Sequence, residues 1–432
     1  MIIGIDLGTT NSLVSIWQND KATLIPNVHG QLLTPSVVGL DTNGQIIVGE
    51  AAKERLVSHP QMTAANFKRY MGTHHEISLG GKSFRPEELS AFILKALKAD
   101  AEAFLGHSIE EAIITVPAYF NDTQRKATKA AGQLAGLKVE RLLNEPTAAA
   151  LAYGIHKKDL DTKYMVFDLG GGTFDVSIVE LFDGIIEVHA SAGDNYLGGE
   201  DFKNQIVKSM LIEHQKALEI DPQNAPIALI ERLGRQAELA KKALSTQDSA
   251  QLNLNWQNQS YQWTLTSKQF EALSEPLLDR LIQPVQRALR DAKLNVNDLD
   301  EIVLVGGATK MPIIRKLVTK LFARFPSLEV NPDEVVAVGA AIQGALKSRN
   351  AEINDVVMTD VCPYTLGIEI VRQLTETQVE KGFFNPIIER NSYVPVSREE
   401  RFFTVEKDQR QLSIRIFQGE NPRVQNNIFS VK

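Results

Sequence analysis

The sequence contains one cysteine, Cys362, among its 432 residues. A single cysteine excludes an intramolecular disulfide and is typical of proteins from a reducing compartment. The N-terminus is apolar but reaches an acidic residue at position 6, with no basic segment before it, so it does not resemble a signal peptide. No apolar run approaches the ~20 residues that a membrane-spanning helix needs. These absences predict a cytoplasmic protein with no membrane partner.

The chain also lacks a basic excess. Its 46 lysine and arginine residues are outnumbered by 53 aspartate and glutamate residues, which gives a net charge of −7. A dedicated nucleic-acid surface normally shows the opposite balance, so the composition argues against a nucleic-acid partner. At 432 residues the chain exceeds the size at which one hydrophobic core keeps growing. Two or more domains are therefore predicted.

What the sequence does contain is a glycine-rich segment that occurs twice. Residues 4–12 are GIDLGTTNS and residues 168–177 are DLGGGTFDVS, so the tripeptide at 6–8 matches the tripeptide at 168–170. Apolar residues flank both copies, which predicts a strand, a tight turn and a second strand in each. Glycine permits the turn and lets backbone N–H groups approach an anion closely.

Two such loops that face each other would clamp the phosphates of one nucleotide. The hydroxyls of Thr9, Thr10 and Thr173 would add donors, and Asp6 and Asp168 at the strand ends would hold a cation. The plainer interpretation is two glycine hairpins that only turn the chain. Neither copy is a Walker A loop, because no G-x-x-x-x-G-K-[ST] sequence lies near it.

The remaining pattern repeats one order of elements in both halves of the chain. Apolar residues at spacings of three and four predict a helix over 87–105, and residues 112–116 are typical of a buried strand. Asp122 is the expected N-cap of a helix that reaches about residue 136. The second half is expected to have a strand at 301–305 and helices near 200–217, 226–246, 267–293, 311–325 and 333–348.

Collinear sequence blocks along most of the chain resemble the heat shock protein 70 chaperone family. The blocks are GIDLGTTNS (4–12), NFKRYMG (66–72), ITVPAYFNDTQR (114–125), NEPTAAALAYG (144–154), DLGGGTFDVS (168–177), LGGEDF (197–202), VLVGGATKMP (303–312) and NPDEVVAVGAAIQGA (331–345). The segments CPYTLGIEI (362–370), PIIERN (386–391) and FQGEN (417–421) are similar to the divergent bacterial HscC branch of that family.

This resemblance implies an α/β fold with a duplicated ribonuclease H-like (actin-like) ATPase domain, a linker and the start of an all-β peptide-binding sandwich. The expected actin-like nucleotide-binding domain covers residues 1–352, with lobes of about 1–165 and 166–352 that each carry an inserted subdomain. The linker is expected at 353–361 and a partial client domain at 362–432. The chain is expected to stop within that sandwich.

The resemblance implies ATP hydrolysis to ADP with Mg²⁺, and the family suggests K⁺ as a further ion. Asp6 and Asp168 are expected to hold Mg²⁺ largely through its water shell, because Mg²⁺ keeps several waters. Lys68 is expected to place a positive charge beside the transferred phosphoryl group, while Glu145 and Asp175 orient or deprotonate the attacking water. From local sequence alone, Lys68 could equally belong to a solvated basic pair and Glu145 could be a helix-entry carboxylate.

The other nucleotide contacts are also carried over from the family. The phosphate loops are expected to contribute Gly8, Thr9, Thr10, Asn11, Gly170, Gly171, Gly172 and the catalytic Thr173. The further contacts are Gly198, Gly199, Glu200, Glu238, Lys241, Lys242, Ser245, Gly306, Gly307, Ala308, Lys310 and Asp333. The four from 238 to 245 have the spacing of one helix face, which is also the pattern of an ordinary solvated face.

The family further implies a relay from the γ-phosphate to a client domain. Its expected members are Pro117, Arg125, Val356, Val357 and Asp360. Each has a plainer interpretation, as the end of a strand, a helix surface residue or part of an ordinary strand. Thr359 stands where the family has leucine, which should weaken linker docking by about 1 kcal/mol through lost apolar burial.

The implied partners are unfolded or extended apolar peptides and a J-domain cochaperone. The short hairpin expected over 248–266 leaves contact with a nucleotide-exchange factor open. Alternating apolar residues at 393–396, 402–405 and 412–417 predict half-buried strands in the client domain.

Two other functions fit the same superfold. A small-molecule kinase would need a sugar-binding aspartate in its cleft and would lack the linker and the β tail. A filament-forming ATPase would assemble longitudinally when ATP is bound.

Overall fold

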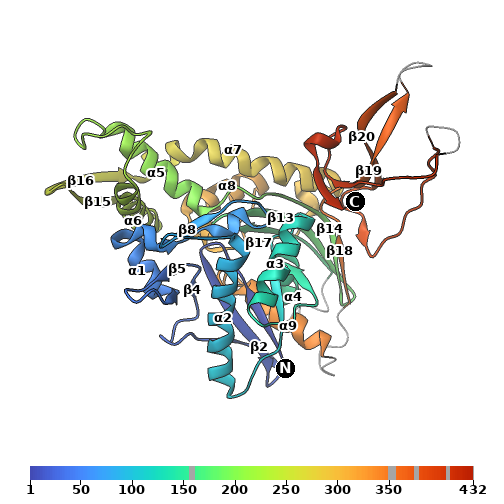
Figure 1. Ribbon diagram of the computed structural model, residues 1–432, viewed down its shortest axis with the longest axis horizontal. Helices are drawn as coiled ribbons and strands as arrows, with labels where there is room; N and C mark the ends of the chain where they lie inside the picture. Colours follow the sequence, from blue (N-terminus) through green and yellow to red (C-terminus); the bar gives the residue numbers. More distant parts are fainter. Residues whose placement is uncertain (155–160, 349–356, 374–378, 405–408, 432) are drawn as a thin grey trace.

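The computed structural model describes residues 1–154, 161–348, 357–373, 379–404 and 409–431. Two lobes share one pattern of strands and helices, and a C-terminal sheet projects from the second lobe (Figure 1). This arrangement agrees with the predicted duplicated α/β ATPase fold followed by a β-rich region.

The first lobe is built on a mixed sheet with the strand order β11-β10-β1-β2-β3, and β4 also pairs with β2. β1 runs parallel to β10 and antiparallel to β2, so the first glycine loop joins neighbouring strands. The strand bounds are β1 (Ile2–Asp6), β2 (Asn11–Gln18), β3 (Lys21–Ile25), β4 (Thr34–Pro35), β10 (Glu111–Val116) and β11 (Leu142–Asn144).

The second lobe repeats this plan in a sheet with the order β17-β12-β13-β14-β18-β21. β12 runs parallel to β17 and antiparallel to β13, which is the relation of β1 to β10 and β2. The predicted repeat of the glycine hairpin is therefore confirmed. The strand bounds are β12 (Thr162–Leu169), β13 (Phe174–Phe182), β14 (Ile185–Asp194), β17 (Glu301–Val305), β18 (Val357–Val361) and β21 (Tyr393–Val394).

Two helices rich in small residues lie between the sheets. α9 (Val335–Lys347) packs on β1, β2 and β10, while α4 (Glu145–Gly154) packs on β12, β13 and β14 and also against α9. All ten residues of α4 are buried, as expected for a helix that is covered on every side. A Cβ atom on Gly339 would collide with the backbone of Ala148, so only glycine allows the two helices to approach this closely.

The remaining helices cover the outer faces of the sheets or form the inserted parts. The helices are α1 (Glu50–Ser58), α2 (Pro86–Leu105), α3 (Asp122–Leu134), α5 (Gly199–Glu213), α6 (Ile227–Ala243), α7 (Ser267–Asp291) and α8 (Pro312–Phe322). The inserted strands are β5 (Val38–Leu40), β6 (Ile46–Val48), β7 (Thr63–Ala64), β8 (Ile77–Leu79), β9 (Lys82–Phe84), β15 (Ser249–Trp256) and β16 (Gln259–Thr266). The hairpin β15–β16 and α6 form the arm at the upper left of Figure 1.

The C-terminal region extends the second sheet before it forms a sheet of its own. β18 lies parallel to β14, with Val357 opposite Ile185, and β21 pairs with β18 on its other side. The separate sheet has the order β20-β19-β22-β23 and a small core of Phe384, Phe417 and Val424. Its strand bounds are β19 (Leu366–Gln373), β20 (Val379–Ile388), β22 (Ile416–Gln418) and β23 (Ile428–Val431).

Several predicted boundaries differ from those observed. The N-cap of α3 is Asn121, whose side chain accepts a hydrogen bond from the N–H of Gln124, so the prediction of Asp122 was off by one residue. Residues 402–404 and 412–415 are not in strands, because alternation alone supplies no partner strand for the backbone. The predicted strands at 393–396 and 412–417 shrink to β21 and β22.

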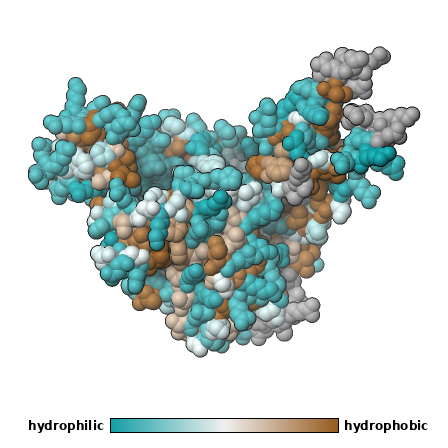
Figure 2. All heavy atoms as spheres, viewed as in Figure 1, coloured by the Kyte–Doolittle hydropathy of each residue, from teal (hydrophilic) through white to brown (hydrophobic). Residues whose placement is uncertain are grey.

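Most of the visible surface is hydrophilic, with apolar patches over both the first lobe and the C-terminal region (Figure 2). Exposed apolar side chains of the C-terminal region include several outside its strands. Phe403 and Leu412 are the most exposed of these, at 91% and 71%. Among the residues that the structure describes, no helix has the length and apolarity required to span a bilayer.

Candidate functional site

The two glycine loops of the repeat face each other where the lobes meet. A Cβ atom on Gly171 would collide with the hydroxyl of Thr10 in the other loop, so the approach depends on glycine. The N–H groups of Gly199 and Glu200, at the start of α5, donate to the carbonyls of Gly170 (2.9 Å) and Gly171 (2.8 Å). The second loop is thus fixed to a helix N-terminus, where backbone N–H groups and the helix dipole favour an anion.

Four acidic side chains converge beside the loops. Asp6 ends β1, Asp168 lies opposite Asp175 in the β12–β13 pair, and Glu145 begins α4. Burial, followed by the nearby Glu145 carboxylate, raises the pKa of Asp6 to about 7 and that of Asp175 to about 7. The same two causes raise the pKa of Asp168 well above its usual range.

Asp168 has an unmet electrostatic requirement. Its Oδ2 atom is buried and has no hydrogen-bond partner within the described parts of the chain. Buried carboxylates that repel one another are unfavourable unless a proton or a cation neutralises them. The Asp6 and Asp168 pair therefore fits a divalent cation held between the lobes. Among the residues that the structure describes, no three His, Cys, Asp or Glu side chains form a direct metal cluster.

Lys68 is the buried positive charge of this group. Its side chain is only 3% exposed, and its Nζ lies 2.9 Å from Oε1 of Glu145. It comes from a short 3₁₀ turn at Phe67–Tyr70 that also reaches the other lobe, since Arg69 pairs with Asp201 at 2.9 Å. The interpretation of Lys68 as part of a solvated basic pair is wrong, because the side chain points into the protein.

Only some of the residues expected to contact adenosine lie together in the structure. Lys241 donates to the carbonyl of Gly199 at 3.1 Å and pairs with Glu238 at 2.6 Å, whereas Lys242 is exposed. α6 ends at Ala243, so Ser245 lies beyond the helix and the predicted four-residue helix face is wrong in its last member.

A second group of residues expected to contact the nucleotide lies beyond β17. Gly306 precedes a 3₁₀ turn at Gly307–Lys310 that includes Ala308, and Lys310 pairs with Asp333. A Cβ atom added to Gly199 would lie 3.2 Å from Cβ of Ala308, so this turn lies close to the start of α5.

A chain of hydrogen bonds leads from Arg125 through Asn144, the neighbour of Glu145 in the sequence, toward β18. Arg125 donates to the carbonyls of Phe120 (2.9 Å) and Ala118 (3.0 Å) and to Oδ1 of Asn144 (2.7 Å), the residue next to Glu145. The side chain of Asn144 donates to Asp360 at 2.9 Å. The Asp360 carboxylate has a second donor, because Thr147 also donates to it, at 2.8 Å.

The other predicted relay residues differ in their placement. Pro117 is buried at the end of β10, where its carbonyl accepts from the N–H of Phe120. Val357 pairs through its backbone with β14 but is 56% exposed, and Val356 lies outside the described residues.

Comparison with known proteins now decides the family. The model of the family described as Hsp70 protein matches residues 2–80 and 73–431. The chain is 46% identical over 439 residues to the chaperone protein DnaK of Thermotoga neapolitana, with 99% of this chain and 72% of that protein covered. It is 45% identical over 436 residues to the chaperone protein DnaK of Thermosipho africanus, with 99% and 71% covered. The chain belongs to the Hsp70 family.

Membership of the Hsp70 family makes this chain an ATP-dependent chaperone with ATPase activity. The likeness to the HscC branch stays a prediction, since the relatives compared here are DnaK proteins.

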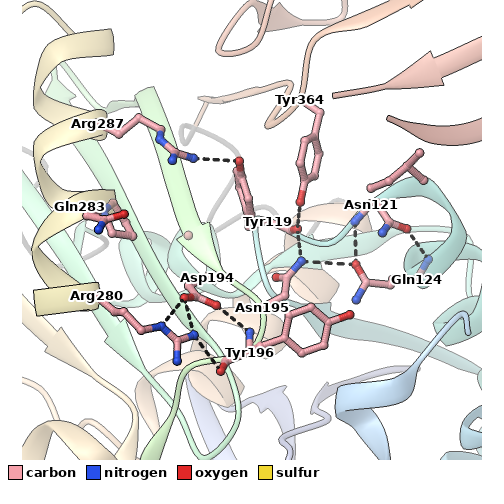
Figure 3. A pocket seen from close by; sticks show the side chains of 13 residues that line it. Tyr119, Asn121, Gln124, Asp194, Asn195, Tyr196, Arg280, Gln283, Arg287 and Tyr364 are labelled. Carbon is pink, nitrogen blue, oxygen red and sulfur yellow. Dashed lines mark hydrogen bonds and ion pairs between the residues drawn. The ribbon is translucent and has the colours of Figure 1, made fainter. Parts of the chain in front are cut away.

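Some contacts between the Hsp70 lobes and the C-terminal region were not predicted from the sequence. Arg390 binds Asp291 through Nε (2.8 Å) and Nη2 (2.9 Å), and Gln418 accepts from the backbone N–H of Asp122 (2.8 Å). The Tyr364 hydroxyl donates to the carbonyl of Tyr119 at 2.8 Å (Figure 3). Arg390 lies in PIIERN and Gln418 in FQGEN, so the only available signal was their place in the family blocks.

The raised pKa values predict that nucleotide-free protein loses stability as the pH rises. A carboxyl whose pKa rises on folding stabilises the fold fully below its ordinary pKa of 3.8, and this contribution is lost as the pH rises through about 7. The melting temperature of Mg²⁺-free protein should therefore fall from about pH 4 to about pH 7 and level off above it. Asp175→Asn should flatten this dependence, and addition of Mg²⁺ and ADP should remove most of it. A melting temperature that is constant over this range would contradict the assignment.

Proposed function

We propose that the two facing glycine loops, Lys68 and the four carboxylates form the ATP hydrolysis centre of this Hsp70 chain. The observation that carries the proposal is the convergence of both copies of the repeat on one buried lysine–carboxylate group. Phosphoryl transfer depends mostly on positioning and on neutralising charge, and this group supplies both.

Each part of the centre has a distinct task in this proposal. The N–H groups and hydroxyls of the two loops hold the β- and γ-phosphates, and the charge of Lys68 faces the γ-phosphate. Asp6 and Asp168 hold hydrated Mg²⁺, which neutralises phosphate charge when bound. The family suggests K⁺ as a second ion.

The attacking water is assigned to Glu145 and Asp175. Oε1 of Glu145 is taken by Lys68, which leaves Oε2 free to accept from a water. Oδ1 of Asp175 accepts from the N–H of Tyr119 at 3.1 Å, so that carboxylate is held in one orientation. Two oriented acceptors on different elements can align a water for in-line attack and take up its proton.

The adenosine contacts are proposed along α6 and the 3₁₀ turn after β17. The hydrogen bond from Lys241 to the carbonyl of Gly199 and the closeness of Ala308 to Gly199 support a common surface for ribose and base. Lys310 is proposed to close over the base, although its ion pair with Asp333 must then open or shift.

Coupling to clients is proposed to run through Asn144 and Asp360 to the segment 353–361 as linker. Extended apolar peptides would bind the C-terminal sheet, where main-chain hydrogen bonds grip a strand-like segment. A J-domain cochaperone is proposed as a partner of this chain, and the identity of any exchange factor is left open. The proposed location is the cytoplasm.

Single-turnover hydrolysis of ATP tests this proposal. The chain should convert ATP to ADP and phosphate with Mg²⁺ and lose this activity when EDTA removes the cation. Arms with an apolar peptide and with a J-domain protein test coupling, and no change in either would contradict the coupling while leaving the hydrolysis centre standing. Phosphorylation of a sugar, or ATP-dependent sedimentation as filaments, would instead favour one of the other functions of the superfold.

A further inference from the structure

Ser36, the residue that follows β4, contacts the first glycine loop twice. Its backbone N–H donates to the carbonyl of Thr10 at 2.8 Å, and its hydroxyl donates to the carbonyl of Gly8 at 2.8 Å. The hydroxyl has one hydrogen and gives it to Gly8, so its oxygen accepts from the Ser12 hydroxyl, which lies 2.9 Å away. Ser36 is only 2% exposed. It therefore holds the carbonyls on both sides of Thr9 from within the first lobe.

The direction of the Gly8 carbonyl determines the direction of the next N–H group. A peptide unit is planar and trans, so its C=O and N–H bonds point in opposite directions. The N–H of Thr9 shares a peptide unit with the Gly8 carbonyl and therefore points away from Ser36. Thr9 is only 6% exposed, yet this N–H donates to no acceptor among the residues that the structure describes. Backbone N–H groups of buried residues are normally paired, so this one is available to a ligand.

The Thr9 side chain lies where the two glycine loops meet. A Cβ atom added to Gly172 would lie 2.7 Å from Cγ2 and 2.9 Å from Oγ1 of Thr9. Thr10 approaches Gly171 in the same way, with its Oγ1 1.8 Å from such an added atom. The peptide unit that Ser36 orients thus belongs to the part of the first loop that contacts the second.

We propose that Ser36 is a positioning residue for the phosphates of the bound nucleotide. Its hydroxyl holds the peptide unit of Gly8 and Thr9 in one orientation, so that the Thr9 N–H is already directed at a phosphate oxygen before the nucleotide arrives. The inference rests on the proposed function of the two loops as the phosphate site. Without the hydroxyl this peptide unit is free to rotate, and the nucleotide must then fix it at a cost in affinity.

Calorimetric titration of the whole chain with ADP in the presence of Mg²⁺, and separately with adenosine, tests the proposal. Adenosine has the base and ribose of ADP but no phosphate. Ser36→Ala should weaken ADP binding by about tenfold, because a charge-assisted hydrogen bond to the phosphate is no longer preorganised. Its affinity for adenosine should stay unchanged. A merely structural role for Ser36 would instead lower both affinities together.

A second variant tests the same hydrogen-bond chain with a smaller change. Ser12→Ala leaves the bond from Ser36 to Gly8 in place and removes only the donor behind it. It should weaken ADP binding by about two- to threefold, again with no effect on adenosine. Equal affinity of both variants and the wild type for ADP, or a parallel loss for adenosine, would overturn the inference and leave the hydrolysis centre standing.

The second lobe offers a matched control. Ser177 and Ser191 form another buried hydroxyl pair, at 2.7 Å, between β13 and β14. Ser191→Ala makes the same chemical change as the other two variants and should bind ADP as the wild type does. Equal weakening by Ser191→Ala would also overturn the inference. Wild-type protein that binds ADP no more tightly than adenosine would contradict the proposed phosphate site itself, and this inference with it.

Discussion

Replacing Lys68 by alanine should lower the rate of ATP hydrolysis by roughly a hundred- to a thousandfold, the usual effect of removing one preorganised charge from a reaction centre. The substitution also leaves Glu145 buried near three other carboxylates without its 2.9 Å ion-pair partner. Nucleotide binding should persist, because the glycine loops and the start of α5 remain in place. Single-turnover hydrolysis and equilibrium binding of ADP separate these two effects.

A matched control for this prediction lies in the same lobe. Lys53 pairs with Glu50 at 3.1 Å, but its side chain is 47% exposed, so Lys53→Ala removes the same charge without opening a buried site. It should retain wild-type hydrolysis. Lys68→Met keeps most of the side-chain volume, and it should be as inactive as Lys68→Ala if charge rather than packing is what matters. Near wild-type activity of Lys68→Met would overturn the assignment.

Replacing Asp360 by alanine should weaken the docking of β18 on the two lobes, because its side-chain contacts to β11 and α4 are lost. The Asp360 carboxylate accepts hydrogen bonds from Asn144 and Thr147, and its removal leaves both donors unpaired in a buried place. Each unpaired buried group costs about 1–3 kcal/mol, so the two together should lower the docked fraction relative to the undocked one by at least about thirtyfold. Hydrogen exchange of the β18 amides, followed by mass spectrometry, measures this shift.

A substitution at the neighbouring residue, Thr359, should instead strengthen the docking of β18. Oγ1 of Thr359 is buried and has no hydrogen-bond partner in the described ranges, so Thr359→Val removes an unsatisfied hydroxyl and adds a methyl group. Exchange in β18 should slow by about three- to tenfold. Asp279→Ala, an exposed position on α7, repeats the chemical change of the Asp360 variant and should not alter exchange. Equal exchange in all three variants would contradict the role of β18 as a docked linker.

The repeat of the glycine hairpin could be predicted because each copy is local in sequence. Strand, turn and strand lie within a few residues, and both copies require the same backbone geometry. The helices α2, α3 and α5 to α9 were also predicted, with ends that differ by a few residues. The helix α4 was not predicted, because it is buried on every side and has no apolar face to mark it. Strands after residue 400 were predicted less well, since alternation does not determine which partner strand is available.

The features that could not be predicted from the sequence depend on contacts between distant residues. The pair of Asp291 and Arg390 spans 99 positions, and neither residue has a local pattern that marks it. Lys68 differs from an ordinary surface lysine because its side chain is buried, and that burial depends on how the lobes pack. The cation-binding role of Asp6 and Asp168 was predicted from the repeated hairpin and again from the family resemblance. The burial of the Asp168 carboxylate and its unpaired Oδ2 atom became visible only in the folded chain.

The placement of α9 has a consequence for synthesis on the ribosome. The strands of the first lobe have all been made once residue 144 is added, yet the helix that covers one face of their sheet spans residues 335–347. The Ser15 hydroxyl, for example, donates to the carbonyl of Ala337, which is 322 positions away. The first lobe cannot bury that apolar face while the second is still being translated, so neither lobe completes its folding alone. This chaperone must itself carry an exposed sheet face through most of its own translation.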